Sequence, residues 1–316
     1  MSDRRGYLVP ALTVAACVGV LITGCATPAP NSSAGASTVA ASAVAPAASA
    51  AATAASVPAR SAPGSAAPAL PECDGGVLST LAPGQLTIAT GTPAASPWFA
   101  GESPASGEGL ESAVAFAVAQ ALGYGPDRVT WTTADRAQAA AGTVTGFDVD
   151  LDQFTAPDAG TPTADYSTGY FSVTEALVMA KSATAAPESA AELHGLALGT
   201  VTGTSGAADV QRITGTSPTG YSDQSRALAG LRSGAVTGVV LSTPAAIASA
   251  AADPGIRVVG QLPTDPSSQP EQFKILLPKG SALTGCVSAA VDRLRVEGTL
   301  DALARQWVDP VVPTLG

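Results

Sequence analysis

Two hydrophobic patterns alternate along residues 84–308, and this alternation constrains the fold more than any other feature of the chain. Short β-rich runs such as "QLTIAT" and "RVTWTT" are separated by stretches whose apolar residues recur at helical spacing. In the first such stretch Leu110, Val114 and Val118 fall on one helix face, and Gly123 follows its end. Strands that alternate with helices favour parallel sheets flanked by helices.

The alternation restarts after Pro187, which predicts two α/β lobes with the second inserted into the first. We expect lobe 1 at residues 73–181 and 272–316, and lobe 2 at residues 182–271. Ser222 is the expected N-cap of a helix in the second lobe. The predicted strands are 85–90, 128–133, 147–154, 175–181, 196–201, 237–242, 256–262 and 272–278, and the predicted helices are 110–122, 136–142, 203–213, 222–234, 244–252 and two between 287 and 307.

The N-terminus has the features of a secretory signal. Arg4 and Arg5 precede an apolar run that ends in "LITGC", and this string resembles the bacterial lipobox, whose cysteine, here Cys25, is lipidated. An uncleaved anchor helix is the alternative, because the run is close to the minimum length of a membrane span. We therefore expect a signal peptide over residues 1–24, and a tether rich in Ala, Ser and Pro from the lipidated cysteine to residue 72.

Composition excludes several classes of protein. The formal net charge of -10 and the scarcity of lysine do not fit a nucleic-acid-binding protein. His194 is the only histidine, so we expect it to be exposed, and we expect neither a metal site nor a Ser–His–Asp triad. We predict no cofactor and no enzymatic activity.

Cys73 and Cys286 remain after export and are expected to form a disulfide, with two free thiols as the alternative.

Four strings follow one another along the chain: "GLESAVAFAVAQALG", "FDVDLDQFTAPDAGTPTADYSTGYF", "LGTVTGTSG" and "FKILLPKGSALTGCVSAAVDRLRVEGTLDALARQW". They resemble, in this order, the motifs of the extracellular solute-binding protein family that serves polar amino-acid ABC importers. The resemblance covers about residues 84–308 and implies a periplasmic-binding-protein-like fold of type II, with two parallel or mixed sheets flanked by helices. The crossings between its lobes should lie near residues 180–185 and 268–273. Both cysteines would then lie in the first lobe, so that a bridge between them leaves the hinge free.

The resemblance also implies ligand contacts at the seam between the lobes. An aromatic lid would correspond to Trp98 and Phe99, with lobe packing as the alternative. The other implied contacts are polar residues of both lobes, for which helix capping or solvation is the alternative: Asp152, Gln153, Thr155, Thr204, Ser205 and Ser242.

Both charged residues with which the family holds a free amino acid are replaced. The arginine that pairs the ligand's carboxylate corresponds to Gly160, and the aspartate that receives its ammonium group corresponds to Ser242. A cationic or neutral polar ligand is therefore favoured over an ordinary amino acid.

The implied protein is a lipid-anchored monomer on the extracytoplasmic face of the cell membrane that delivers its solute to an ABC permease. The alternative is a ligand sensor or partner-docking lipoprotein, for example one that serves a membrane sensor kinase.

Overall fold

The structure, a computed structural model, describes residues 73, 78–92, 95–100, 103–156 and 162–316. The predicted signal peptide, Cys25, the tether and Gly160 lie outside these residues. In the part of the chain that is described, no helix is long and apolar enough to cross a membrane.

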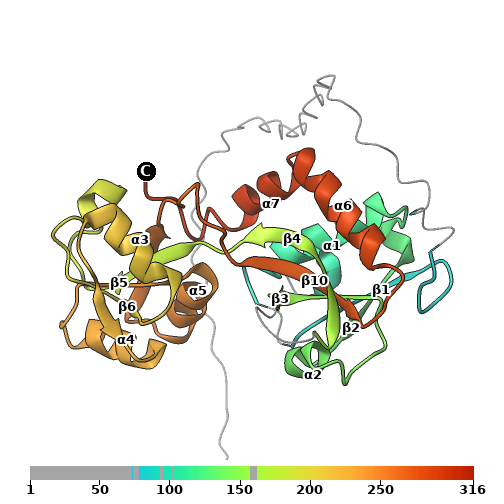
Figure 1. Cartoon of the computed structure of the whole chain (residues 1–316), viewed down its shortest axis with the longest axis horizontal. Coiled ribbons are helices and arrows are strands. Elements are labelled where there is room, and N and C mark those ends of the chain that lie inside the picture. Colours follow the sequence, from blue (N-terminus) through green and yellow to red (C-terminus); the bar gives the residue numbers. More distant parts are fainter. Residues whose placement is uncertain (1–72, 74–77, 93–94, 101–102, 157–161) are drawn as a thin grey trace, which may run out of the picture. The chain divides into compact units, whose positions relative to one another are not determined.

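The first sheet has five strands in the order β2-β1-β3-β10-β4 (Figure 1). β1 runs parallel to β2 and β3, whereas β10 is antiparallel to both β3 and β4. The strands are β1 (Leu86–Thr90), β2 (Val129–Thr133), β3 (Val149–Phe154), β4 (Ala164–Ser172) and β10 (Gln272–Pro278). The sheet is mixed, which agrees with the expectation of parallel or mixed sheets, because the returning strand β10 inserts between β3 and β4.

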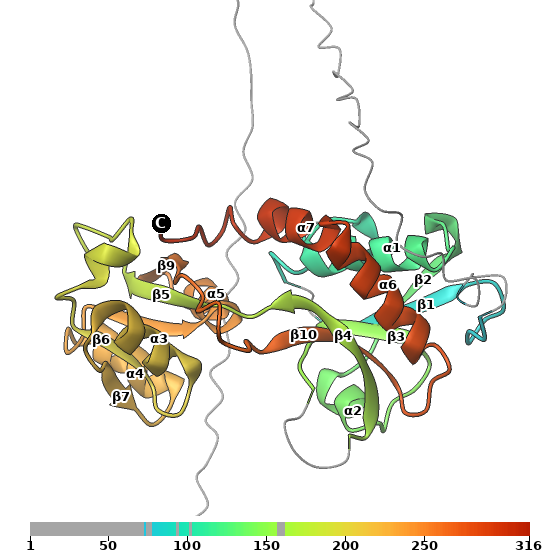
Figure 2. The same cartoon turned by 45° about the horizontal axis from the view of Figure 1, so that its top comes forward.

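Helices cover both faces of the first sheet. α1 (Leu110–Ala121), α6 (Thr284–Val296) and α7 (Thr299–Trp307) pack together on one side, and α2 (Arg136–Ala140) contacts β3 on the other side (Figures 1 and 2). The short helices η1 (Pro104–Ser106) and η2 (Pro126–Arg128) flank α1 in the sequence.

The second sheet has the order β7-β6-β8-β5-β9, in which β5 is antiparallel to β8 and β9. Its strands are β5 (Glu175–Ala180), β6 (Leu198–Val201), β7 (Thr219–Tyr221), β8 (Gly238–Ser242) and β9 (Ile256–Gln261). The elements that surround these strands are η3 (Ala190–Leu193), α3 (Ser205–Thr214), α4 (Gln224–Arg232) and α5 (Thr243–Ala252). The N-cap of α4 is Asp223 rather than the predicted Ser222, because the Asp223 carboxylate accepts a hydrogen bond from the Arg226 backbone N–H.

Two boundaries of the lobes differ from the prediction. Glu175–Ala180 pairs within the second sheet, so the chain crosses at Val173 and Thr174 instead of near 180–185. The last residues also return to the second sheet. Thr314 bridges Gln261, and the Leu315 N–H donates to the Gln261 carbonyl.

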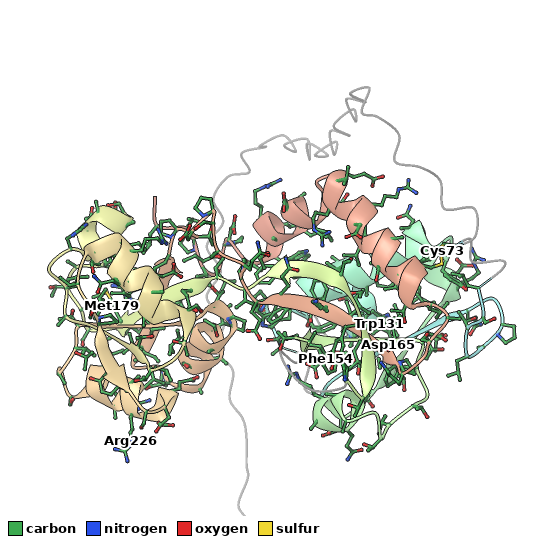
Figure 3. All side chains as sticks on the ribbon, viewed as in Figure 1. Cys73, Trp131, Phe154, Asp165, Met179 and Arg226 are labelled. Atoms are coloured by element: carbon green, nitrogen blue, oxygen red, sulfur yellow. A yellow bond between two sulfur atoms is a disulfide. The ribbon has the colours of Figure 1, made fainter. Side chains whose placement is uncertain are left out.

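The first lobe is held by an aromatic core and a disulfide. Trp98 packs edge-on against Phe171 and Phe273, with ring centroids 5.5 and 5.3 Å away. Cys73 is bonded to Cys286 of α6, which confirms the predicted pair (Figure 3). Both sulfurs belong to the first lobe, so the bridge does not span the crossings.

Candidate ligand-binding site

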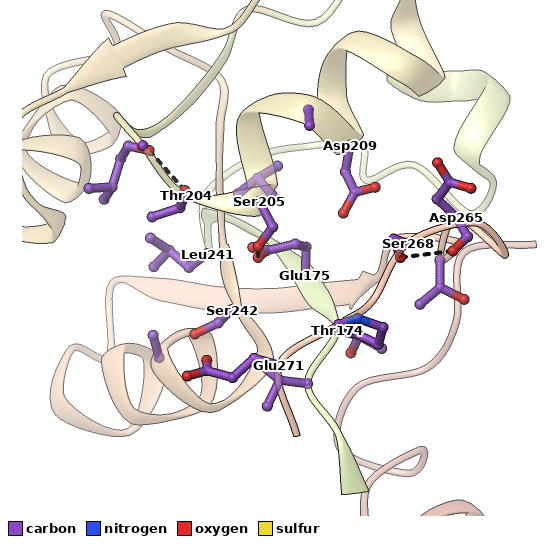
Figure 4. A pocket seen from close by; sticks show the side chains of 18 of the residues that line it. Thr174, Glu175, Thr204, Ser205, Asp209, Leu241, Ser242, Asp265, Ser268 and Glu271 are labelled. Carbon is purple, nitrogen blue, oxygen red and sulfur yellow. Dashed lines mark hydrogen bonds between the residues drawn. The ribbon is translucent and has the colours of Figure 1, made fainter. Parts of the chain in front are cut away.

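A cavity of about 840 Å³ lies beside the second sheet. It is bordered by the start of β5, the N-terminus of α3, the end of β8 and the segment that precedes β10 (Figure 4). Three of the residues predicted to contact a ligand line it, namely Thr204, Ser205 and Ser242. Their hydroxyl groups give this wall both donors and acceptors.

The start of α3 positions two of these hydroxyls. Thr204 is the N-cap, although its hydroxyl donates to the Val201 carbonyl at 2.8 Å instead of capping a helical N–H. Ser205 donates from its hydroxyl to Oε1 of Glu175 at 2.5 Å. The serine therefore joins the first turn of α3 to the first residue of β5.

Glu175 is a functional candidate that the sequence analysis missed. It is only 7% exposed, although it stands at the entrance of a buried apolar strand. Burial raises the pKa of Glu175, and the hydrogen bond from Ser205 opposes that rise. The sequence offers one signal for this role, a single carboxylate directly before the apolar run "ALVMA". A charged side chain is seldom buried in an apolar strand unless it is paired.

The remaining charged groups around this cavity are mainly acidic. Asp209, Asp265 and Glu271 line it together with one cation, Arg212. Arg212 donates to Asp209 at 2.9 Å and to the Pro263 carbonyl. The protein's own acceptors therefore already engage this guanidinium.

A smaller hollow of about 420 Å³ is lined by the other predicted polar residues, Asp152, Gln153 and Thr155. Ser242 and Glu271 line both hollows. The two groups of predicted contacts, from β3 and from the second sheet, thus meet around Ser242.

The backbone at the end of β3 has an unusual conformation. Gln153 has φ of 54°, which makes it the one non-glycine residue with positive φ among those described. Its N–H donates to Oε1 of buried Glu111 at 2.7 Å. On the other side, Arg136 donates to the carbonyls of Asp152 and Gln153 at 2.8 and 2.9 Å. These contacts hold Gln153 in a left-handed conformation beside the hollow.

Two buried carboxyl groups lie behind this turn. Burial raises the pKa of Glu111 to about 7, although hydrogen bonds from Tyr170 and Gln153 oppose the rise. Burial, reinforced by the charges of Asp152 and Glu111, raises the pKa of Asp150 to about 8. Neither oxygen of Asp150 has a hydrogen-bond partner in the described part of the chain. Both groups are therefore protonated more readily than ordinary surface carboxyls.

The structure places the two predicted lid residues in the core of the first lobe. Trp98 is 3% exposed and Phe99 is 5% exposed. Neither lines the cavity beside β5 or the smaller hollow beside Asp152. The arrangement agrees with the packing alternative for both side chains.

The structure also bears on the excluded chemistry. His194 is exposed, as predicted. No group of three or more acidic, histidine or cysteine side chains suited to a metal ion is found among the described residues.

Comparison with known proteins gives a family match over residues 86–310, to the bacterial extracellular solute-binding proteins, family 3. Curated proteins gave no match. Among solved structures, the arginine-, lysine-, histidine-binding protein ArtJ from Geobacillus stearothermophilus is 20% identical, with a TM-score of 0.40 over 71% of this chain and 95% of that one. The L-cystine receptor of Neisseria gonorrhoeae is 20% identical, with a TM-score of 0.46 over 71% and 92%. A substrate-binding domain of a putative amino acid ABC transporter from Streptococcus pneumoniae is 19% identical, with a TM-score of 0.47 over 71% and 100%.

Proposed function

The chain belongs to the bacterial extracellular solute-binding proteins of family 3, and from that premise we propose that it captures a small polar solute outside the cytoplasm for an ABC importer. Capture requires no chemical step. Contacts with the solute favour one arrangement of the two lobes, and that arrangement is recognised by the permease.

The cavity beside β5 is the observation that supports this proposal most directly. Its volume of about 840 Å³ lies in the range of small-molecule sites. Thr204, Ser205 and Ser242, which the family resemblance marks as ligand contacts, contribute to one wall. Asp152, Gln153 and Thr155 line the adjoining hollow. We propose these six as the polar ligand contacts.

We also propose that the protein is a monomer anchored through lipid on Cys25, at the end of a tether that reaches to residue 72. Labelling cells with an alkyne analogue of palmitate tests the anchor. The label should appear on the wild-type chain and be lost in Cys25→Ala. Equal labelling of both chains contradicts it.

A thermal-shift screen of the full-length chain in detergent tests the function. The library contains amino acids, diamines, guanidino compounds, betaines and short peptides. A bound solute should raise the melting temperature with its concentration, because it binds the folded state alone. Small-angle scattering should then show a more compact protein. The absence of any stabilising solute would contradict solute capture.

Replacement of the family's aspartate by Ser242 favours a second candidate, a sensor that binds solute without feeding a permease. Pull-down of the full-length chain with its membrane partner separates the two. Recovery of a permease–ATPase complex supports transport, and recovery of a membrane kinase supports sensing.

A further inference from the structure

The cavity beside β5 is surrounded by more negative than positive charge. Glu175, Asp209, Asp265 and Glu271 line it, against the single cation Arg212 in the described lining. Arg212 is held by Asp209, by the Pro263 carbonyl and, at 4.0 Å, by Asp265. Glu175 and Glu271 are consequently the two carboxylates of this lining with no ion pair among the described residues.

Of the two carboxylates without an ion pair in the described lining, Glu175 is the more buried and therefore has the greater need of a positively charged partner. The residue is 7% exposed, and only Oε1 accepts a hydrogen bond, from Ser205. Within the described chain Oε2 accepts none. This oxygen faces Gly206 at the start of α3, where a methyl group in place of the glycine hydrogen would lie 3.1 Å from it. A buried carboxylate without a counter-ion is costly, so a positively charged group that enters the cavity is stabilised there.

A ligand carboxylate would meet the opposite conditions. It would lie among four acidic side chains, beside an arginine that already pairs with Asp209 and Asp265. The adjoining hollow offers no better partner. There, Nε and Nη2 of Arg136 donate to the carbonyls of Asp152 and Gln153. Acceptors of the protein thus already engage both guanidinium groups, so a ligand carboxylate would have to compete with them for a bidentate pair.

The kind of cation is restricted by the lining. None of the described lining residues of this cavity is aromatic, so the site lacks the ring faces that hold quaternary ammonium groups. Hydroxyl and carboxylate oxygens from Thr204, Ser242 and Glu175 instead accept hydrogen bonds from N–H groups.

We propose that this cavity binds an organic cation that bears N–H groups and no carboxylate, namely a primary diamine or an aminoalkyl guanidine, with Glu175 and Glu271 pairing its two charges. This inference rests on the proposed solute-binding function and names its ligand class. The raised pKa of Glu175 supports it, because a bound cation favours the ionised carboxylate and binding should release a proton.

Three pairs of ligands that differ only in the carboxylate group test the proposal: agmatine and arginine, putrescine and ornithine, cadaverine and lysine. Binding to the full-length chain in detergent is measured by isothermal titration calorimetry. In at least one pair the decarboxylated compound should bind about tenfold or more tightly than its amino acid, because the latter adds a negative charge to a lining that already carries four carboxylates and one arginine. Amino acids that bind as tightly as their decarboxylated partners overturn the inference and leave solute capture intact. Binding of none of the six also overturns it, while the wider thermal-shift library decides on capture separately.

Glu175→Gln tests the buried carboxylate. The substitution keeps the shape of the side chain and removes its charge, so affinity for the decarboxylated ligand should fall about tenfold or more. The matched control is Glu108→Gln, at an exposed carboxylate in the first lobe, which should leave affinity unchanged. Titration in two buffers of different ionisation enthalpy should show proton release for wild type and none for Glu175→Gln.

Glu271→Gln provides a second test if Glu175→Gln does not fold. Glu271 is exposed, so its substitution should leave the fold intact and weaken binding to a smaller extent. Unchanged affinity in both folded variants would overturn the proposal.

Discussion

Each of the two lobes contains its own five-stranded mixed sheet, but the cores of the two lobes consist of different kinds of side chain. Of the aromatic residues after residue 72, all but Tyr221 belong to the elements of the first lobe or their connections. The second lobe relies on aliphatic side chains, such as Leu177, Met179 and Val240. Its helices and strands approach closely where glycine allows, and Tyr221 lies against both Gly199 and Gly230.

The difference extends to polar groups. The first lobe buries Glu111 and Asp150 behind the end of β3, and it is cross-linked by Cys73 and Cys286. The second lobe has no disulfide among its described residues, and Glu175 borders a cavity. The comparison teaches that the first lobe tolerates costly buried groups because a covalent bond and an aromatic core stabilise it, whereas the second lobe depends on close packing. Three predictions test that view.

Loss of the disulfide should have the largest effect. The bridge joins residues separated by 213 positions, and the chain-entropy estimate for a loop of that length is about 5 kcal/mol, an upper figure. In Cys73→Ser with Cys286→Ser, hydrogen exchange should quicken chiefly in β1, β3 and β10. Equal quickening in β6 and β8 would show that the lobes do not differ in this respect.

Removing the charge at Asp150 should have the next largest effect, and it should depend on pH. Burial raises the folded-state pKa from 3.8 to about 8. The unfolded chain therefore loses this proton at lower pH than the folded chain does, and stability falls as pH rises through that interval. Asp150→Asn should gain a few kcal/mol relative to wild type between about pH 5 and about pH 9, as measured by urea denaturation.

The control for this prediction is Asp301→Asn, at an exposed position of α7, whose difference from wild type should stay constant over the same pH range. A constant difference for Asp150→Asn as well would show that Asp150 ionises normally in the folded protein.

A methyl group at Gly230 should have the smallest effect of the three and act on the second lobe. A Cβ there would lie 2.2 Å from the Tyr221 hydroxyl oxygen and 2.6 Å from its ring. Gly230→Ala should therefore cost about 1–3 kcal/mol through overpacking. Gly285→Ala in α6 is the control, because nothing lies within 4 Å of its Cβ and alanine favours a helix. A stable Gly230→Ala protein would mean that the second lobe adjusts more easily than its close contacts indicate.

Most secondary-structure elements could be predicted from local patterns, but two strands could not. β4 (Ala164–Ser172) carries Gly169 and mixed polarity, and β7 (Thr219–Tyr221) has three residues. Both lack a clear alternation of period two, so only pairing with β10 and β6 identifies them.

The candidate site could likewise be predicted only in part, because some of its contacts join residues that are distant in the sequence. Thr204, Ser205 and Ser242 could be located because they stand in short strings that resemble family motifs. The sequence marks Glu175 only as a lone carboxylate ahead of a buried strand, because its contact with Ser205, thirty positions away along the chain, exists only in the fold. Trp98 and Phe99 were expected at a ligand, but Phe171, Phe273 and Trp131 surround them in the folded core.

The sequence by itself determined the family, the two alternating α/β segments and the cysteine pair, because each is encoded in local order and spacing. Only the tertiary structure decided that Glu175–Ala180 belongs to the second sheet, that the C-terminal residues return there, and which carboxylates border the cavity. These outcomes depend on which distant segments pair and on what burial does to a charge, and neither quantity can be read from neighbouring residues.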